Sequence, residues 1–270
     1  MTVPRPHAIV TACDARCGDF LVRHWLRSLR DNVDLRAIDV VVLDFGLTPA
    51  QRSALADVVL VPARLEGRIN VARRRELACF LESRAYDQVL SVDGGDVIFQ
   101  GDVSPLFETD KARFRGVVER YPLPVGLFLR GAPRAERERV RQRLAGRPMI
   151  NGGFVLGPAK QFATLGEAVV RHLPHFRYDQ PIVSGLLYEA GFEPLPDTCN
   201  FVPWTSRERF RVEQGFFYGS DGEKLLVVHN TGRRDVLRVV RDFGYGVGYN
   251  RAVRTSYLRL AAAYRKLRGA

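Results

Sequence analysis

Two aspartates separated by two glycines follow a short apolar run in the stretch SVDGGDVIFQGD, residues 91–102. Asp93 ends the apolar run, and Asp96 comes three residues later, after Gly94 and Gly95. Glycine lets a backbone turn sharply and approach a ligand closely. Carboxylate oxygens held in this way are ligands that Mg²⁺ and Mn²⁺ prefer, and such ions also bind substrate phosphates. The alternative is a structural glycine turn capped by aspartate, which is a common loop.

The residues before this stretch alternate between apolar runs and segments with helical spacing. Continuous runs rich in β-branched residues are typical of strands buried on both faces, as in a parallel sheet. We therefore expect a doubly wound α/β unit over residues 1 to about 100, with Asp93 at the carboxyl edge of the sheet, where ligands bind. The expected strands are residues 7–13, 38–46, 57–63 and 87–93, and the expected helices are residues 18–32, 48–56 and 70–84.

The chain after residue 100 is less regular, but it shows no internal repeat and no clear linker. We expect one domain, residues 1–250, followed by a basic amphipathic helix, residues 251–270. Further strands are expected at residues 114–120, 149–157 and 224–230, and further helices at residues 158–173, 179–191 and 251–268.

The net charge of the 270-residue chain is +11, which suits a partner such as nucleic acid, anionic lipid or nucleotide phosphate. Basic residues gather in two stretches, residues 130–147 and 251–270. Aromatic side chains do not interleave with them as stacking platforms would, so we do not expect nucleic acid as a partner.

The tail, residues 251–270, combines six basic residues with an apolar stripe. Either it packs on the domain as a terminal helix, or it lies on an anionic membrane surface and brings the protein to a lipid-linked partner. The sequence leaves both open. The stripe consists of Val253, Tyr257, Leu260, Tyr264 and Leu267.

Several common protein classes are excluded. The cysteines, Cys13, Cys17, Cys79 and Cys199, lack paired zinc-ligand spacing, so we expect free thiols and no structural zinc. The N-terminus has no secretory pattern, and no run approaches the ~18 apolar residues of a membrane span, which indicates a cytoplasmic protein. The sequence also lacks a nucleoside-triphosphate phosphate loop, a Gly-x-Ser-x-Gly elbow and, after its first strand, a Gly-x-Gly-x-x-Gly loop.

The stretch LSVDGGDVIFQGDVSPLF resembles the metal-binding segment of glycosyltransferases with the GT-A fold, and most closely that of family 8-like members. Four more segments, in matching order, resemble other parts of these enzymes. IVTACD (9–14) is similar to the strand whose end holds the nucleotide base, and INGGFVLGPAKQF (150–162) to the strand that lines the donor-sugar pocket. YDQPIVSGLL (178–187) is similar to the helix start at the reacting face, and VVHNTG (227–232) to the segment whose histidine binds metal.

The resemblance covers about residues 7 to 232. It implies an α/β fold, a single GT-A (Rossmann-like) domain of the nucleotide-diphospho-sugar transferase superfamily, with a mostly parallel central sheet flanked by helices. Gly95 departs from the pattern, because it stands where these enzymes carry the second aspartate of Asp-x-Asp.

The resemblance also implies roles for individual residues. Asp93, Asp96 and His229 would hold Mn²⁺ or Mg²⁺. Asp179 and Gln180 would form the catalytic pair, with Asp179 on a sugar hydroxyl and Gln180 near the anomeric carbon. The sequence does not decide which of the adjacent arginines 73–75 reaches the donor. The implied donor-binding residues are Ala12, Asp14, Arg73, Asp93, Asn151, Gly152, Gly153 and Arg233.

The implied function is metal-dependent transfer of a sugar from a nucleotide-diphosphate donor, with a UDP-sugar favoured, to a glycan or a lipid-linked acceptor. The departing diphosphate needs charge neutralisation, which a divalent ion supplies. Likeness to family 8-like enzymes implies retention of configuration, whereas an inverting enzyme would need a carboxylate base such as Asp179. The alternative, motivated by Gly95, is a catalytically degenerate GT-A-like protein that binds nucleotide or an anionic polymer. We expect a cytoplasmic location, at the inner face of the membrane if the tail binds lipid.

Overall fold

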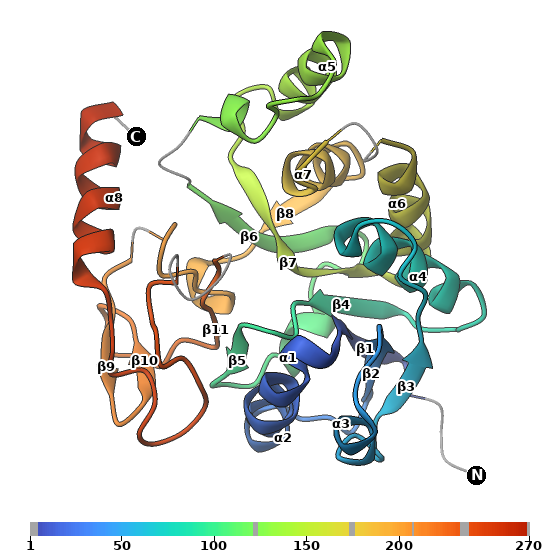
Figure 1. Ribbon diagram of the computed structural model, residues 1–270, viewed down its shortest axis with the longest axis vertical. Coiled ribbons are helices and arrows are strands. Elements are labelled where there is room, and N and C mark those ends of the chain that lie inside the picture. Colours follow the sequence, from blue (N-terminus) through green and yellow to red (C-terminus); the bar gives the residue numbers. More distant parts are fainter. Residues whose placement is uncertain (1–4, 121–123, 173–175, 207, 233–237, 269–270) are drawn as a thin grey trace.

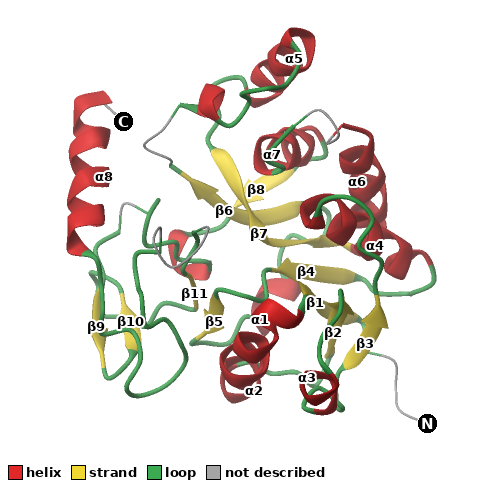
Figure 2. Cartoon of the chain, in the orientation of Figure 1, coloured by secondary structure: helices red, strands yellow, loops and turns green. Residues whose placement is uncertain are grey.

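The computed structural model describes residues 5–120, 124–172, 176–206, 208–232 and 238–268. Within these residues a seven-stranded sheet runs through the molecule, with helices on both of its faces (Figure 1, Figure 2). The strand order is β3-β2-β1-β4-β7-β6-β8. The expected fold class, α/β with a mostly parallel central sheet, is confirmed.

The N-terminal half forms the parallel part of the sheet, as the sequence predicts. β1 pairs in parallel with β2 and β4, and β2 pairs in parallel with β3. The first expected helix is one continuous helical segment made of α1, η1 and α2. Helix α3 begins with a capping box formed by Thr48 and Gln51. The strands are β1 (His7–Cys13), β2 (Ile38–Asp44), β3 (Val59–Pro62) and β4 (Gln88–Val92); the helices are α1 (Ala15–Phe20), η1 (Leu21–Leu26), α2 (Arg27–Asn32), α3 (Pro49–Ser53) and α4 (Ile69–Glu82).

The rest of the main sheet changes direction at β7, which is antiparallel to both β4 and β6, while β6 pairs in parallel with β8. The strands are β6 (Phe114–Glu119), β7 (Met149–Pro158) and β8 (Phe192–Pro194). The helices are η2 (Ser104–Glu108), η3 (Val125–Leu127), α5 (Arg134–Leu144), α6 (Ala159–His172) and α7 (Gln180–Glu189).

Two small sheets lie beside the main one and were not expected. β5 (Val97–Phe99) pairs antiparallel with β11 (Val227–His229), and β9 (Arg211–Glu213) pairs antiparallel with β10 (Phe216–Tyr218). The expected strand at residues 224–230 is therefore wrong in extent, because its partner β5 offers only three residues to pair with. The short helix η5 (Asp197–Cys199) precedes β9, β10 and β11 in the chain.

Two apolar layers cover opposite faces of the main sheet, because successive strand residues point to opposite sides. Ala8 and Val10 of β1 pack with α4, α6 and α7, whereas Ile9 packs with η1 and α2 on the other face. In the second layer the buried Trp25 meets Phe99 of β5 edge to face, with ring centroids 5.6 Å apart. This contact anchors the segment that follows Asp93 to the N-terminal helix.

The C-terminal helix α8 (Thr255–Arg268) lies at the edge of the molecule (Figure 1). Tyr257 packs against Trp204, and Leu258 joins a third apolar cluster around β5, β10 and β11. The predicted stripe is wrong at Leu260, which is 65% exposed because the body of the protein meets the side of α8 that carries Tyr257, Leu258 and Ala261. The side chains of Tyr264 and Leu267 lie outside the described residues. None of the described helices is long and apolar enough to span a membrane.

Candidate functional site

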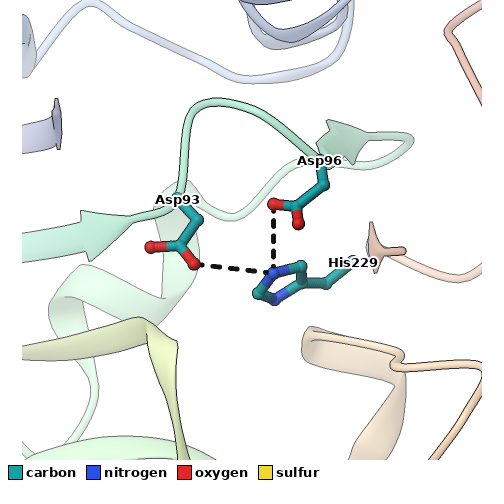
Figure 3. A group of neighbouring side chains, drawn as sticks. All are labelled: Asp93, Asp96 and His229. Carbon is teal, nitrogen blue, oxygen red and sulfur yellow. Dashed lines mark ion pairs between the residues drawn. The ribbon is translucent and has the colours of Figure 1, made fainter. Parts of the chain in front are cut away.

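Asp93, Asp96 and His229 meet at the carboxyl edge of the sheet (Figure 3). Asp93 follows β4, and Asp96 precedes β5, whose Val97 pairs with His229 at the end of β11. His229 Nε2 lies 3.3 Å from Asp96 Oδ1 and 3.7 Å from Asp93 Oδ2. One ligand atom from each residue lies within 4.8 Å of the others. The small β5–β11 sheet thus unites residues 133 positions apart in the chain.

Burial and charge act in opposite directions at this group. Burial alone disfavours the charged imidazole, but the carboxylates of Asp96 and Asp93 outweigh it and raise the pKa of His229. Burial likewise opposes ionisation of Asp93, but the Arg73 guanidinium and His229 hold the pKa of this carboxyl below its ordinary value. The group therefore pairs two carboxylates with an imidazole that must lose its proton before Nε2 can bind a metal ion. Two carboxylates and an imidazole form a donor set that fits Mn²⁺ or Mg²⁺.

The two glycines between the aspartates are required for space. A Cβ atom at Gly94 would lie 2.6 Å from Thr11 Oγ1, and one at Gly95 would lie 2.9 Å from Cys17 Sγ. Neither glycine has a positive φ, so the sharp turn expected from the sequence is not the reason for them. Because α1 packs directly against Gly95, a carboxylate side chain does not fit there without displacing Cys17. The second carboxylate of the group comes from Asp96 instead.

The structure separates the roles of the three adjacent arginines. Arg73 donates to Asp93 Oδ1 and, at 3.1 Å, to Asp179 Oδ2, so it joins two of the predicted site carboxylates. Arg74 is buried behind the site and donates to Gly152 O at 2.6 Å, and burial lowers its pKa to about 10. Arg75 pairs at the surface with Glu66 and Glu76. Arg73 is therefore the arginine that reaches the cavities described next.

Two cavities meet at the carboxylates. The first, of about 360 Å³, lies beside the end of β1 and the start of α4. The second, of about 260 Å³, lies beside the end of β6, the start of β7 and the start of α7. Arg73, Asp93, Asp96 and Asp179 line both cavities. A ligand that extends from one cavity to the other would pass over the Asp93–Asp96–His229 group.

The first cavity holds the predicted residues Ala12 and Asp14. Asp14 also has a structural task, since its carboxylate accepts from the backbone N–H groups of Arg16 and Cys17 at the start of α1. Arg233, predicted to bind the donor, lies outside the described residues. Arg238, which sequence reasoning missed, lines this cavity and lies 3.8 Å from Asp96 Oδ2.

The second cavity holds the remaining predicted residues. Asn151 Oδ1 accepts from Gly153 N at 2.9 Å, and Gly153 O accepts from Asp93 N at 2.9 Å, so the start of β7 is fixed against the Asp93–Asp96–His229 group. Gln180 begins α7 beside Asp179, which accepts from Asn70 at 3.2 Å. The second cavity also contains the buried carboxylate of Glu119, which sequence reasoning missed because a carboxylate at a strand end has no distinctive spacing.

Comparison with protein-family models and with curated protein sequences gave no match. Among solved structures, the chain is similar to the galactosyltransferase LgtC in complex with donor and acceptor sugar analogs, at 18% identity over 95% of each chain and a TM-score of 0.56. The active-site mutant Q189E of LgtC matches at 19% identity, again over 95% of each chain, with a TM-score of 0.56.

The bifunctional glycosyltransferase WbbM, in its apo form, matches at 14% identity and a TM-score of 0.61. That match covers 84% of this chain but only 46% of WbbM, so this chain spans about half of the WbbM chain. At sequence identities below 20%, these similarities show a shared fold and nothing about activity. The chain therefore has the fold of these glycosyltransferases, which is the GT-A fold that the sequence resemblance implied.

Proposed function

We propose that this protein is a metal-dependent glycosyltransferase that moves a sugar from a nucleotide-diphosphate donor to a glycan or lipid-linked acceptor. One observation carries the proposal: in a chain with this fold, Asp93, Asp96 and His229 converge where two cavities meet. In a sugar nucleotide the diphosphate lies between the nucleoside and the sugar. In this protein the Asp93–Asp96–His229 group likewise lies between the two cavities, so each part of the donor has a matching place.

Asp93, Asp96 and His229 would hold Mn²⁺ or Mg²⁺. When bound, such an ion would neutralise the charge that develops on the departing diphosphate. Arg238 lines the first cavity beside Asp96, and its guanidinium would add positive charge next to the phosphates. A metal ion would also offer Asp93 a second cationic partner besides Arg73, so donor binding and the Arg73 ion pair are expected to be linked.

The nucleoside would occupy the first cavity and the sugar the second. Ala12 and Asp14 lie at the end of β1, where a base and ribose would contact the backbone and the rim of the cavity. Asn151 and Asp179 would contact sugar hydroxyls, and Gln180 would lie near the reacting carbon. We propose UDP as the nucleotide, from the family 8-like resemblance of the motifs.

We propose that the configuration at the anomeric carbon is retained. An inverting reaction needs a carboxylate base beside the acceptor, and Asp179 is the predicted candidate. Its carboxylate already accepts hydrogen bonds from Arg73 and Asn70. This arrangement suits a residue that orients the site better than one that removes a proton from an acceptor.

Release of nucleoside diphosphate from a panel of sugar nucleotides tests the proposal. Turnover is expected with Mn²⁺ or Mg²⁺, with loss in EDTA and a fall of about 100-fold or more in the Asp96→Asn variant. Asp102→Asn, which removes an aspartate six residues away that caps a surface turn, is the matched control and should leave turnover unchanged. Metal-independent turnover, or full activity of Asp96→Asn, would contradict the proposal.

The second candidate, a catalytically degenerate GT-A-like protein that binds nucleotide or an anionic polymer, is favoured by Gly95 at the position of the second aspartate. Binding of a nucleoside diphosphate without turnover of any sugar nucleotide would support it. Turnover would exclude it.

We further propose that α8 rests on an anionic membrane, which would place a cytoplasmic enzyme beside a lipid-linked acceptor. Arg259, Leu260 and Lys266 are exposed on α8. Truncation is a poor test, because Tyr257 and Leu258 pack on the body of the protein. The double variant Arg259→Glu, Lys266→Glu should bind phosphatidylglycerol vesicles at least about tenfold more weakly, since each basic residue contributes about 1 kcal/mol.

The matched control for the vesicle measurement is Arg134→Glu, Arg141→Glu on α5, which changes the net charge by the same amount on another exposed helix. Vesicle binding is measured by co-sedimentation. An equal loss of binding in both double variants would show only a general effect of charge and would contradict a specific role of α8.

A further inference from the structure

Strand β7 does not run straight past the candidate site. Gly116 and Val118 of β6 lie two positions apart, but their partners in β7, Val155 and Ile150, lie five positions apart. The extra residues of β7 form a bulge, residues 151–154, and bulges beside active sites re-aim side chains. The first three residues of the bulge line the second cavity. The bulge is therefore the part of β7 that would face a sugar.

The buried side chain of Arg74 holds this bulge at its centre. Gly152 pairs with neither β4 nor β6 in the part of the chain that the structure describes, so its carbonyl needs another donor. Arg74, which is 3% exposed, supplies one: its Nη2 donates to Gly152 O at 2.6 Å. A longer contact of 3.5 Å joins Arg74 Nη1 to Ser91 Oγ on β4. The guanidinium therefore ties the bulge to the strand that ends just before Asp93.

Two further hydrogen bonds link the bulge to the candidate site. Gly153 N donates to Asn151 Oδ1 at 2.9 Å, which fixes the direction of the Asn151 side chain in the second cavity. Gly153 O accepts from Asp93 N at 2.9 Å. Because Gly152 lies between Asn151 and Gly153, a shift of its carbonyl would displace the Asn151 side chain.

The surroundings of Arg74 leave it room for small shifts only. A Cβ atom at Gly166 would lie 2.8 Å from Arg74 O, so α6 packs directly against the backbone of α4 here. The cavity that Arg74 does line, beside β1 and β4, has a volume of about 10 Å³, which is the room of one water molecule. The described residues that line the two larger cavities do not include Arg74, so it would not touch a bound donor.

We propose that Arg74 is a positioning residue: it holds the Gly152 carbonyl, and thereby keeps the bulge of β7 and the side chain of Asn151 in place beside the sugar. This inference rests on the proposed function, which puts the sugar in the second cavity. A guanidinium suits this task, because its N–H donors have fixed directions and its charge strengthens the hydrogen bond to the carbonyl. Without this donor, the bulge would have to move until the carbonyl met another one.

Substitution at position 74 tests the positioning role. Arg74→Met keeps an unbranched side chain but removes the donor, and kcat with a sugar nucleotide is expected to fall about 100-fold. The dissociation constant of the nucleoside diphosphate with Mn²⁺ should stay within about fivefold, because the bulge does not line the first cavity. Arg74→Lys keeps a charged donor and should restore kcat to within about tenfold of the wild type.

The matched control for this substitution is Arg75→Met, the same change at the next position. Arg75 pairs at the surface with Glu66, so its loss should change kcat by less than about twofold. Both variants lose one positive charge, and a kcat of Arg74→Met equal to that of Arg75→Met would overturn the proposal.

A double-mutant cycle tests whether Arg74 acts through Asn151. Adding Arg74→Met to Asn151→Ala should change kcat by less than about threefold, since the side chain that the bulge carries is already absent. Multiplication of the two losses would show that Arg74 acts by another route, such as its charge near Asp93, and would overturn the positioning role.

The contact can also be measured without turnover. In ¹⁵N-glycine-labelled protein, the backbone signals of Gly152 and Gly153, assigned by their loss in the respective alanine variants, should shift strongly in Arg74→Met and weakly in Arg75→Met. Unchanged glycine signals in Arg74→Met would overturn the contact and with it the proposal. A crystal structure of the wild type tests the contact without any substitution, and a Gly152 carbonyl that accepts from another donor would overturn it. Lack of wild-type turnover would overturn the proposed function itself, and these two measurements distinguish that result from failure of the Arg74 contact.

Discussion

At the scale of single residues, the backbone of β7 lies directly against the side chains that would hold the metal ion. A Cβ atom at Gly153 would lie 2.5 Å from Asp93 Oδ2 and 2.6 Å from His229 Cε1. At Gly152 the nearest atom of the described residues would be Arg74 Nη2, at 3.4 Å. The two adjacent glycines therefore differ sharply in how closely they approach the candidate site.

This difference predicts unequal effects of Gly153→Ala and Gly152→Ala. The added methyl group at position 153 must displace Asp93 or His229, so Mn²⁺ affinity should fall at least about tenfold. Gly152→Ala should change the affinity by less than about threefold, because the end of an arginine side chain can move. Calorimetric titration with Mn²⁺ measures both, and thermal unfolding confirms that both variants fold. Equal affinities for the two variants would contradict the site.

The candidate site was predictable from the sequence only in part. The positions of Asp93 and Asp96 follow from an apolar run and the residues after it. The choice of Arg73 did not follow, because adjacent helix positions differ by about 100° and only the packing of α4 decides which one faces the cavities. Glu119 and Arg238 were missed, since the first is recognised by its burial and the second by its place beside Asp96.

At the scale of elements, the strands β1 to β4 were predictable because each is a continuous apolar run. β5, β8, β9 and β10 were missed because three residues are too few to show a period of two. Their pairing depends on partners far away in the chain, as β5 and β11 show. It is this distant pairing that brings His229 to the aspartates.

The turn after β2 offers an element-scale prediction. Asp44 ends β2 and accepts from Leu47 N at 2.7 Å and Arg52 Nε at 2.6 Å, which links β2 to α3. Burial raises the pKa of Asp44, but the Arg52 guanidinium and the backbone N–H donors outweigh burial and hold it below its ordinary value. Because the folded-state pKa is depressed, this stabilisation is present above the unfolded-state pKa of about 3.9 and is lost as the pH falls through the folded-state pKa.

Asp44→Asn should therefore lower the free energy of unfolding by about 1 kcal/mol at pH 7, and the difference from the wild type should shrink as the pH falls below about 3.9. Urea unfolding at several pH values measures this. Asp57→Asn, which removes an exposed ion pair with Arg30, is the control and should cost less than about 0.5 kcal/mol. A difference for Asp44→Asn that does not vary with pH would contradict the ionic origin.

At the scale of the whole molecule, two apolar layers hold the sheet, and the ligand edge of its strands remains open as two joined cavities. The sequence predicts the parallel N-terminal half of this sheet, since strands alternate with helices there. The net charge of +11 is a property of the same scale and favours anionic partners in general.

The most direct test of the central claim is thermal stability in the presence of UDP, GDP, ADP or CMP, each with and without Mn²⁺, for the wild type and for Asp96→Ala. A site that binds a metal–nucleotide complex predicts a metal-dependent rise for one nucleoside diphosphate, UDP, of about 2.7 kcal/mol at a free ligand concentration of ~100 times the dissociation constant. Asp96→Ala should lose this rise. Absence of a metal-dependent rise with any nucleotide, or an equal rise in Asp96→Ala, would contradict the account.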